Sequence, residues 1–494
     1  MSDTSTTTTS PTSERGRRLT GRLGVGAIVF MVIAAAAPLT VIGGNVPLAV
    51  AGGNGVGAPV GFVLAALVLL VFSVGFVTMT PHVSEAGAFF SYITTGLGSR
   101  AGLGAAFVAL AAYTAIQVGV YGYMGWAAND LVTYFGGPEV PWWVYSFVTV
   151  AVVAVLGFRH IDLSSKVLGV ALVLEISVML ALDVAVFVRG GADGPVLESF
   201  APSHAFGSGL GVAVLFALTG FIGFEATAVF RDEARDPERT IPRATYLAVI
   251  IIGVFYAASC WALIWAAGAQ DAVAVAQRTL DGDGNMMLDT AKDYLGPVLR
   301  DVMNALLISS LFACVLSFHN VLARYMFSLG NKGVLPGRLG DTSPKHHAPS
   351  FASVVQTITA AVLLLVFALV GLDPLVGVFG SMAGVATVGM VLLMMLTSVA
   401  VLVFFARHPD RAGGRTLKTR VAPVLAIVGL LVSLWLVVSN FTLVTGGSAA
   451  VSTVLALVPV AALVLGFALG GRYTLEVETT ETTADGVLVE AAER

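Results

Sequence analysis

Charged side chains are scarce in this chain of 494 residues. Asp, Glu, Lys and Arg together make up 11% of it, while 57% of the residues are hydrophobic. A soluble protein of average composition carries about 25% charged residues. The composition therefore excludes an ordinary soluble domain and predicts a polytopic membrane protein, in agreement with a mean hydropathy of +0.89.

Cysteine and clustered histidine are scarce as well. The two cysteines, Cys260 and Cys314, lie in apolar segments, which excludes a disulfide framework and indicates small buried side chains. The seven histidines form no Cys/His cluster with metal-ligand spacing, so we expect no metal centre and no cofactor. His319 is the one mid-chain candidate for an intramembrane nucleophile–base pair, and no partner is spaced to match it. We therefore expect a protein that is not an enzyme and does not bind nucleic acid.

Apolar runs long enough to cross a bilayer, about 20 residues each, occur about twelve times. They lie near 24–51, 57–79, 101–129, 141–158, 164–188, 207–230, 243–267, 297–322, 351–371, 375–405, 421–444 and 450–470. With the N-terminus inside, only four of the 26 Lys and Arg residues lie outside, namely Arg189, Arg278, Lys292 and Arg300. The positive-inside rule then places both termini in the cytoplasm.

The ends of the chain are polar. Residues 1–20 are rich in Ser and Thr and then become basic, and residues 473–494 are acidic. Both read as disordered cytoplasmic tails around a transmembrane domain at 21–472. One external segment, roughly 268–296, is long and acidic.

Two spans are interrupted in matching positions. Pro38 and Gly43-Gly44 interrupt the first span, and Gly220 and Gly223 interrupt the sixth. Paired broken helices five spans apart are the sequence sign of an inverted-repeat transporter. We predict an all-α fold with repeats at about 21–190 and 205–405, plus two extra helices at 420–470. Backbone amides freed at the breaks would hold a carboxylate, and freed carbonyls an ammonium group or a cation.

Glu225 follows the sixth-span break inside an apolar segment. An ionisable group at membrane depth costs about 2.5–3.5 kcal/mol even on a lenient insertion scale, so such groups usually face a cavity or a partner. Proton coupling and gating of a substrate amine are its two functional interpretations, and a structural hydrogen bond is the alternative.

The other polar residues of the spans allow two interpretations each. Glu175 and Asp183 share a face of the fifth span, with Glu175 at mid-membrane and Asp183 expected in water near the external end. Ser309 and Ser310 are candidate sodium ligands or packing residues. Tyr113 and Gln117, an i, i+4 pair, would border the substrate or join helices.

Three spaced motifs give the chain its resemblance to a known family. They are Phe221-Ile-Gly-Phe-Glu-Ala226 with Glu233-Ala-Arg-Asp-Pro-Glu-Arg-Thr-Ile-Pro-Arg243, Ser84-Glu-Ala-Gly-Ala-Phe-Phe-Ser-Tyr92, and Ala323-Arg-Tyr-Met-Phe-Ser-Leu-Gly-Asn-Lys-Gly-Val-Leu-Pro336. With these motifs, residues 20–470 resemble the amino acid–polyamine–organocation (APC) superfamily of permeases. The resemblance implies a LeuT-like fold with broken helices 1 and 6 and a substrate held between helices 1, 3, 6, 8 and 10.

The resemblance also implies where the substrate binds. Its carboxylate and amine would contact the backbone near Thr40, Val41 and Ile42, flanked by Pro38 and Gly43. The opposite wall would be Phe221, Ile222 and Gly223, with Phe221 as an aromatic gate. Glu225 sits where several relatives carry a proton-coupling glutamate.

The chain departs from the family in two places. Thr40-Val41-Ile42 stands where many members have Gly-Ser-Gly, and Glu175 stands where proton-coupled members often carry a lysine. We expect a plasma-membrane importer of amino acids working by proton symport and alternating access. The alternatives are an amine or polyamine exchanger and a sodium-coupled symporter. The identity of the substrate and the oligomeric state are left open.

Overall fold

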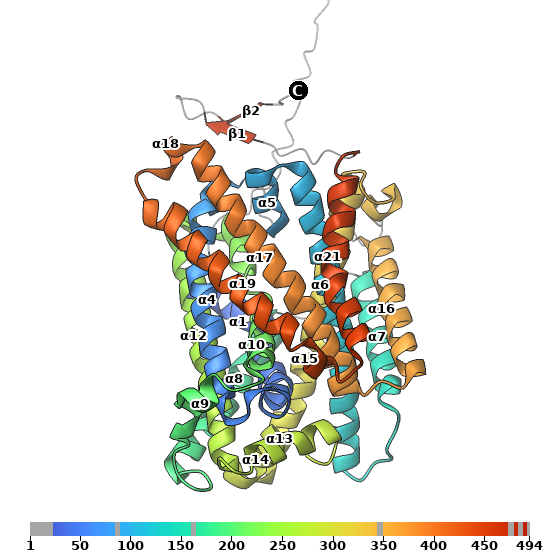
Figure 1. The fold of residues 1–494 in the computed structure, drawn as a ribbon. Coiled ribbons are helices and arrows are strands. Elements are labelled where there is room, and N and C mark those ends of the chain that lie inside the picture. Colours follow the sequence, from blue (N-terminus) through green and yellow to red (C-terminus); the bar gives the residue numbers. More distant parts are fainter. Residues whose placement is uncertain are drawn as a thin grey trace, which may run out of the picture.

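The computed structural model describes residues 23–83, 89–159, 165–342, 349–472, 479–482 and 488–491. This part of the chain is a bundle of long, nearly parallel and antiparallel helices (Figure 1). The predicted tail at 1–20 and the first residues of the motif that starts at Ser84 lie outside the described residues.

The long helices consist mostly of apolar residues. They are α4 (Ala58–Met79), α6 (Ser99–Tyr134), α7 (Trp142–Arg159), α8 (Ser165–Arg189), α12 (Pro237–Ala267), α15 (Pro297–Asn331), α16 (Ser350–Val370), α17 (Ser381–Arg407), α19 (Ala422–Ser439) and α21 (Ala449–Leu469).

Two further membrane segments are divided into short pieces. They are α1 (Val25–Ala35), α2 (Pro38–Thr40), η1 (Val41–Asn45), α3 (Val46–Ala49) and η2 (Val50–Asn54) for the first, and α10 (Leu210–Gly220), α11 (Ala226–Val229) and η6 (Phe230–Glu233) for the second.

Short elements connect the helices at the two ends of the bundle. One end, here called the tail end, carries η4 (Thr80–His82), α5 (Phe89–Leu97), η7 (Gly337–Gly340), α18 (Pro409–Ala412), η9 (Leu417–Val421), β1 (Thr479–Thr482) and β2 (Leu488–Ala491) (Figure 1). The other, the cap end, carries η3 (Gly55–Gly57), η5 (Leu197–Phe200), α9 (Pro202–Ala205), α13 (Ala272–Asp281), α14 (Met286–Leu295), η8 (Pro374–Gly380) and α20 (Phe441–Thr445).

Ten helices of the described residues are long and apolar enough to cross a membrane. One of them, Val25–His82, is interrupted at Gly53 and holds two of the predicted runs, and the sixth run contains only a shorter apolar helix, Leu210–Thr219. The protein is a multi-pass membrane protein with an all-helical bundle, as predicted. The exact number of twelve spans and the repeat boundaries stay predictions.

The helices differ in how deeply they lie in the bundle. The apolar window of α6 is 78% buried within the protein, whereas that of α21 is 22% buried. Helix α21 nevertheless packs tightly on α6, because a Cβ at Gly466 would stand only 2.8 Å from the Cα of Gly104. Small residues allow such close contact between membrane helices. Helix α6 is therefore the central helix around which a transport site would be built.

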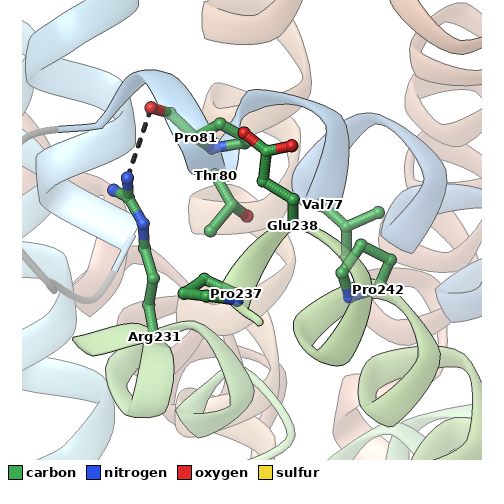
Figure 2. Close-up of a pocket in the computed structure, with 7 residues that line it drawn as sticks. All are labelled: Val77, Thr80, Pro81, Arg231, Pro237, Glu238 and Pro242. Atoms are coloured by element: carbon green, nitrogen blue, oxygen red, sulfur yellow. Dashed lines mark hydrogen bonds between the residues drawn. The ribbon is translucent and has the colours of Figure 1, made fainter. Parts of the chain in front are cut away.

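At the tail end, the segment after the second broken helix is joined to the start of the first and to the connection after α4. Arg231 donates to the carbonyl oxygens of Val83 and Pro81, at 2.6 and 3.4 Å, beside a small pocket that Figure 2 shows. The backbone of Leu23 donates to Glu233 O at 2.9 Å and accepts from Arg235 N at 3.0 Å. The entry to the first broken helix is thus fixed to the exit of the second.

The strands β1 and β2 form an antiparallel hairpin, with Thr479 opposite Ala491. The sequence predicts a disordered tail over 473–494, so the hairpin differs from that expectation. Thr479, Thr480 and Thr482 make up most of β1, and Leu488 and Val489 begin β2; Thr and Val are favoured in strands, which explains why a short polar tail is able to pair with itself.

Candidate transport site

The first helix is broken at Ala36 and Ala37. Helix α1 ends at Ala35, Ala37 has a φ of 46°, and a new helix begins at Pro38. Among the described residues, Ala37 is the only non-glycine with a positive φ. Proline suits the first position of a helix because its missing N–H would be unpaired there in any case.

The break therefore lies directly before Pro38, one of the two places where the sequence predicts an interruption, and not at Gly43 and Gly44. Thr40, Val41 and Ile42 are helical, and Gly43 and Gly44 lie in the π-helical turn η1. The two glycines serve a different need: a Cβ on Gly43 would stand 2.6 Å from Tyr123 Oη, and one on Gly44 would stand 2.7 Å from the Tyr123 ring. They allow a close approach of α6 instead of a break.

The second break lies where the sequence places it. Helix α10 ends at Gly220, helix α11 begins at Ala226, and Gly223 between them has a φ of 109°. Only glycine adopts such a backbone conformation without strain. The two breaks lie side by side, because a Cβ on Gly223 would stand 3.3 Å from the Cβ of Ala35, the last residue of α1.

Glu225 belongs to this second break and is 4% exposed. Its Oε2 accepts a hydrogen bond from Gly223 N at 2.9 Å, and its Oε1 accepts one from Tyr113 Oη at 2.5 Å. The carboxylate thus binds an amide that the break has released and connects the break to α6. Tyr113 therefore joins α6 to the second broken helix, which is one of its two predicted roles, and its place at the border of the substrate stays a prediction.

The first break is held by side chains from other helices. Tyr256 of α12 donates to Ala36 O at 2.9 Å. On the other side, Thr40 Oγ1 donates to Ser310 Oγ at 3.4 Å, and Ser310 Oγ donates to Glu175 Oε2 at 2.9 Å. The carboxylate of Glu175 also lies close to the backbone of Leu39. The carboxylate of α8 therefore lies at the start of the re-formed helix.

The predicted serine pair separates in the structure. Ser310 joins Glu175, whereas Ser309 Oγ donates to Leu306 O of its own helix at 2.9 Å. Asp183 also differs from expectation: it is 4% exposed and accepts from Ser259 Oγ at 2.7 Å, so it is buried rather than in water. Two helix turns below the cap end are enough to bury it between α8 and α12.

A small cavity lies between the two breaks. It measures about 30 Å³, which is room for one or two water molecules. Its walls come from both broken helices and from α6, α15 and η8. They are Ala35, Ala36, Ala37, Thr40, Val41, Asn45, Ile116, Val120, Thr219, Ile222, Cys314, Phe318 and Phe379. The helices around it must move apart before an amino acid fits.

The cavity wall is apolar and uncharged. Its polar side chains are Thr40, Asn45 and Thr219. Asn45 Nδ2 donates to Phe216 O at 2.8 Å, and Thr219 Oγ1 shares a hydrogen bond with Thr387 Oγ1 at 2.6 Å. These bonds join the cap-side halves of the broken helices to each other and to α17.

Three of the predicted substrate residues, Thr40, Val41 and Ile222, line this cavity. The others lie behind the wall or beside it. Phe221 packs against Tyr256, with ring centroids 6.0 Å apart, and Gln117 donates to Val315 O at 3.3 Å and pairs with Gln356. That any of these residues contacts a substrate stays a prediction.

Sequence reasoning missed Asn45, Thr219 and the alanines of the first break. The alanines carry no signal of their own. Asn45 has one, since a polar amide that directly follows two glycines inside an apolar run is costly unless it is paired.

A family model described as amino acid permease matches residues 23–467. The chain belongs to the amino acid permease family. It is 25% identical over 437 residues to the branched-chain amino acid permease BcaP of Bacillus subtilis (strain 168), covering 84% of this chain and 86% of that one. It is 23% identical over 403 residues to BcaP of Lactococcus lactis subsp. cremoris (strain MG1363), covering 77% of this chain and 81% of the relative.

Two further comparisons extend the picture. The low-affinity putrescine importer PlaP of Escherichia coli (strain K12) is 25% identical over 258 residues, 50% of this chain and 54% of PlaP. Among solved structures, a mutant of the manganese transporter of Eremococcus coleocola aligns with a TM-score of 0.56 and 13% identity, over 92% of this chain and 99% of that one. That likeness concerns the fold alone. The family and these relatives are membrane transporters, and they agree with the LeuT-like fold that the broken helices indicate.

Proposed function

We propose that this permease imports neutral amino acids with apolar side chains across the plasma membrane by proton symport and alternating access. The observation that carries the substrate class is the uncharged, mostly aliphatic and aromatic wall of the cavity between the two breaks. Apolar pockets with few polar groups select ligands by shape and hydrophobic contact. The branched-chain permeases among the relatives support the same class.

The backbone at the two breaks suits the polar end of such a substrate. The helix that restarts at Pro38 begins beside the cavity, which Ala37 and Thr40 line, and helix starts favour a carboxylate. Helix α10 ends at Gly220, and the last carbonyls of a helix favour an ammonium group. Both ends of a zwitterion thus find a partner without a charged side chain.

The contacts of Glu225 support its role in proton coupling. As a carboxylate it accepts hydrogen bonds from Gly223 N and Tyr113 Oη. A neutral carboxyl group is a weaker acceptor than a carboxylate. Protonation of Glu225 would therefore loosen the second break and its connection to α6, which is the kind of switch that alternating access requires.

Two alternatives have less support. An amine or polyamine exchanger would place an acid against the substrate, but Glu225 and Glu175 do not line the described cavity. Sodium coupling is favoured by one observation, the oxygens of Thr40, Ser310 and Glu175 gathered beside the first break. Uptake into proteoliposomes under an imposed sodium gradient tests it.

The test is uptake of labelled leucine, valine, lysine and putrescine into proteoliposomes under imposed proton or sodium gradients. We expect uphill accumulation of leucine and valine with an inward proton gradient alone. Accumulation that requires an inward sodium gradient would show that sodium, not the proton, is the coupling ion. Counterflow of putrescine without any leucine transport would show that the substrate is an amine and not a neutral amino acid.

The orientation is part of the proposal. The tail end carries Arg231, Arg235, Arg407 and Arg411, and the positive-inside rule places such an end in the cytoplasm. The small cap end, with α13 and α14, would then face the outside.

A further inference from the structure

Five polar residues gather beneath α14 at the cap end, and together we call them the outer cluster. They are Tyr123, Asp130, Asn285, Arg300 and Asn304. Tyr123 and Asn304 are 0% exposed, Arg300 is 2% exposed and Asn285 is 3% exposed. Burial this deep is unusual for such polar groups unless each of them has a hydrogen-bond partner.

In the outer cluster many of these partners are missing. Over the described residues, half of the buried side-chain N and O atoms without a hydrogen-bond partner belong to it. They are Tyr123 Oη, Asp130 Oδ2, Asn285 Nδ2, Arg300 Nε, Asn304 Nδ2 and Asn304 Oδ1. An unpaired buried polar group costs about 1–3 kcal/mol, so such a concentration in one place points to a ligand.

The geometry of two antiparallel helices brings these residues together. Helix α6 runs toward the cap end and α15 runs away from it. Arg300 lies over the ring of Tyr134, 3.2 Å from its centroid, and Leu307 reaches Gly43 beside Tyr123. Asn304 and Asp130 lie between these two contacts, one turn beyond Arg300 on α15 and one turn before Tyr134 on α6.

The third wall of the outer cluster is α14. Asn285 is its N-cap, with Oδ1 accepting from Leu288 N at 3.1 Å, so the Nδ2 end of the amide is turned away from the helix backbone. Arg300, Asp289 and the side-chain amide of Asn285 all lie near Asp130, but Asn285 Nδ2 makes no hydrogen bond to it. Arg300 also donates to Asp301 at 3.3 Å. The cluster therefore brings one buried cation close to one carboxylate, with Asp289 and Asp301 at its edge.

The unpaired atoms of the outer cluster are of two kinds. Arg300 Nε, Asn285 Nδ2 and Asn304 Nδ2 are donors, whereas Asp130 Oδ2 and Asn304 Oδ1 are acceptors. A single anion or cation would satisfy only one kind. A zwitterion satisfies both, because its carboxylate accepts and its ammonium group donates.

We propose that the outer cluster is a second binding site for the zwitterionic head of an amino acid, with Arg300 on the carboxylate and Asp130 on the ammonium group. This inference rests on the proposed function, because it assumes that amino acids enter from the cap end.

The outer cluster is separated from the cavity between the two breaks by one aromatic pair. Tyr123 lies at the bottom of the cluster and its ring contacts Phe379, with centroids 5.2 Å apart. Phe379 lines the cavity between the two breaks, which we call the central cavity. A substrate held by Arg300 and Asp130 is thus one side-chain layer away from the two helix breaks, so the outer site holds the substrate until this layer opens.

The experiment counts binding sites for labelled leucine on the purified full-length protein by equilibrium binding. Val120→Phe and Ile116→Phe each fill the central cavity, and Asp130→Asn and Arg300→Gln each remove one pole of the outer site. We expect two sites per chain in the unmodified protein, one in each cavity-filled variant and none when Val120→Phe is combined with Asp130→Asn. With Arg300→Gln, the affinity of the outer site should fall by about 10- to 100-fold.

Matched controls carry the same changes at exposed positions of the same segment. Asp293→Asn on α14 and Arg278→Gln on α13 should keep both sites. Thermal unfolding of every variant identifies those that fail to fold, and having two cavity-filled variants keeps the test independent of either one.

The outcomes separate the two proposals. A single site in the unmodified protein that Val120→Phe abolishes overturns the outer site, and leucine uptake by the same protein would leave the proposed function standing. Absence of uptake for every neutral amino acid would overturn the proposed function itself.

In the Val120→Phe protein, neither isoamylamine, which lacks the carboxylate, nor 4-methylpentanoate, which lacks the ammonium group, should displace leucine. Displacement by either one alone overturns the assignment to a zwitterion.

Discussion

The two broken helices meet at the same cavity, but their breaks are stabilised in different ways. The second break uses its own residues: Gly223 supplies the backbone freedom, and Glu225 binds the amide that the break releases. The first break contains an alanine in a left-handed conformation and depends on Tyr256 and Glu175 of other helices.

This difference indicates which break is adjustable. A break that depends on its own carboxylate changes when that carboxylate gains a proton. A break that is held from several sides is fixed, and Ala37 alone stores about 1–2 kcal/mol of backbone strain. We therefore interpret the first break as a rigid joint and the second as the one whose geometry changes.

The largest effect should follow from Glu225→Gln, which removes the charge change from the adjustable break. We expect loss of proton-driven accumulation in proteoliposomes, with exchange of leucine for leucine retained, and a stability change of only about 1 kcal/mol. The matched control is Glu139→Gln in the exposed connection between α6 and α7. Full proton dependence in Glu225→Gln would show that the second break is not the coupling element.

Gly223→Ala should come next, because a Cβ at a φ of 109° strains the backbone of the second break. We expect a loss of about 1–3 kcal/mol in unfolding free energy and a strong loss of uptake. Gly26→Ala in α1, where a Cβ meets nothing within 4 Å, is the control and should keep both. Thermal unfolding and initial uptake rates are measured for both variants. Equal stability and equal uptake in Gly223→Ala and Gly26→Ala would refute the role of Gly223.

Much of the fold follows from the sequence, and part of the site does not. The apolar runs, the second break and Glu225 are readable because glycine, a lone acid and an apolar background are local signals. The first break is readable at Pro38 but not at the glycines, because glycine has two uses: at Gly43 it admits Tyr123, whereas the chain turns at Ala37, directly before Pro38, and is held there by distant partners. The partners of Gln117 and Ser310 are likewise set by helix packing, which no local pattern encodes.

Tyr256→Phe should have a moderate effect on the fixed break. The change removes the hydrogen bond to Ala36 O and keeps the ring contacts with Phe62 and Phe221, at 6.2 and 6.0 Å between centroids. A bond of this kind contributes about 0.5–1.5 kcal/mol, so we expect uptake at low substrate to fall about 2- to 10-fold. Tyr246→Phe on the same helix should leave uptake rates unchanged. A Tyr256→Phe protein with normal uptake would show that the other contacts suffice.

Ala37→Gly should have the smallest effect, and it tests the first break by changing a single methyl group. Glycine relieves the left-handed strain but also makes the unfolded chain more flexible, and the two terms nearly cancel, so we expect a net change of about 0.5 kcal/mol or less. Uptake should persist, because neighbouring helices fix the geometry. A marked loss of uptake with unchanged stability would mean that the Ala37 methyl group itself contacts the substrate.

The backbone pairing of Leu23 with Glu233 and Arg235 has a mechanical consequence. It joins the tail-side halves of both broken helices into one rigid unit, and Arg231 connects this unit by a hydrogen bond to the segment after α4. The joined halves would move as a unit, so an opening at the cytoplasmic face would move α1 and α11 together. A probe placed just before Leu23 would consequently report the motion of the second broken helix as faithfully as that of the first.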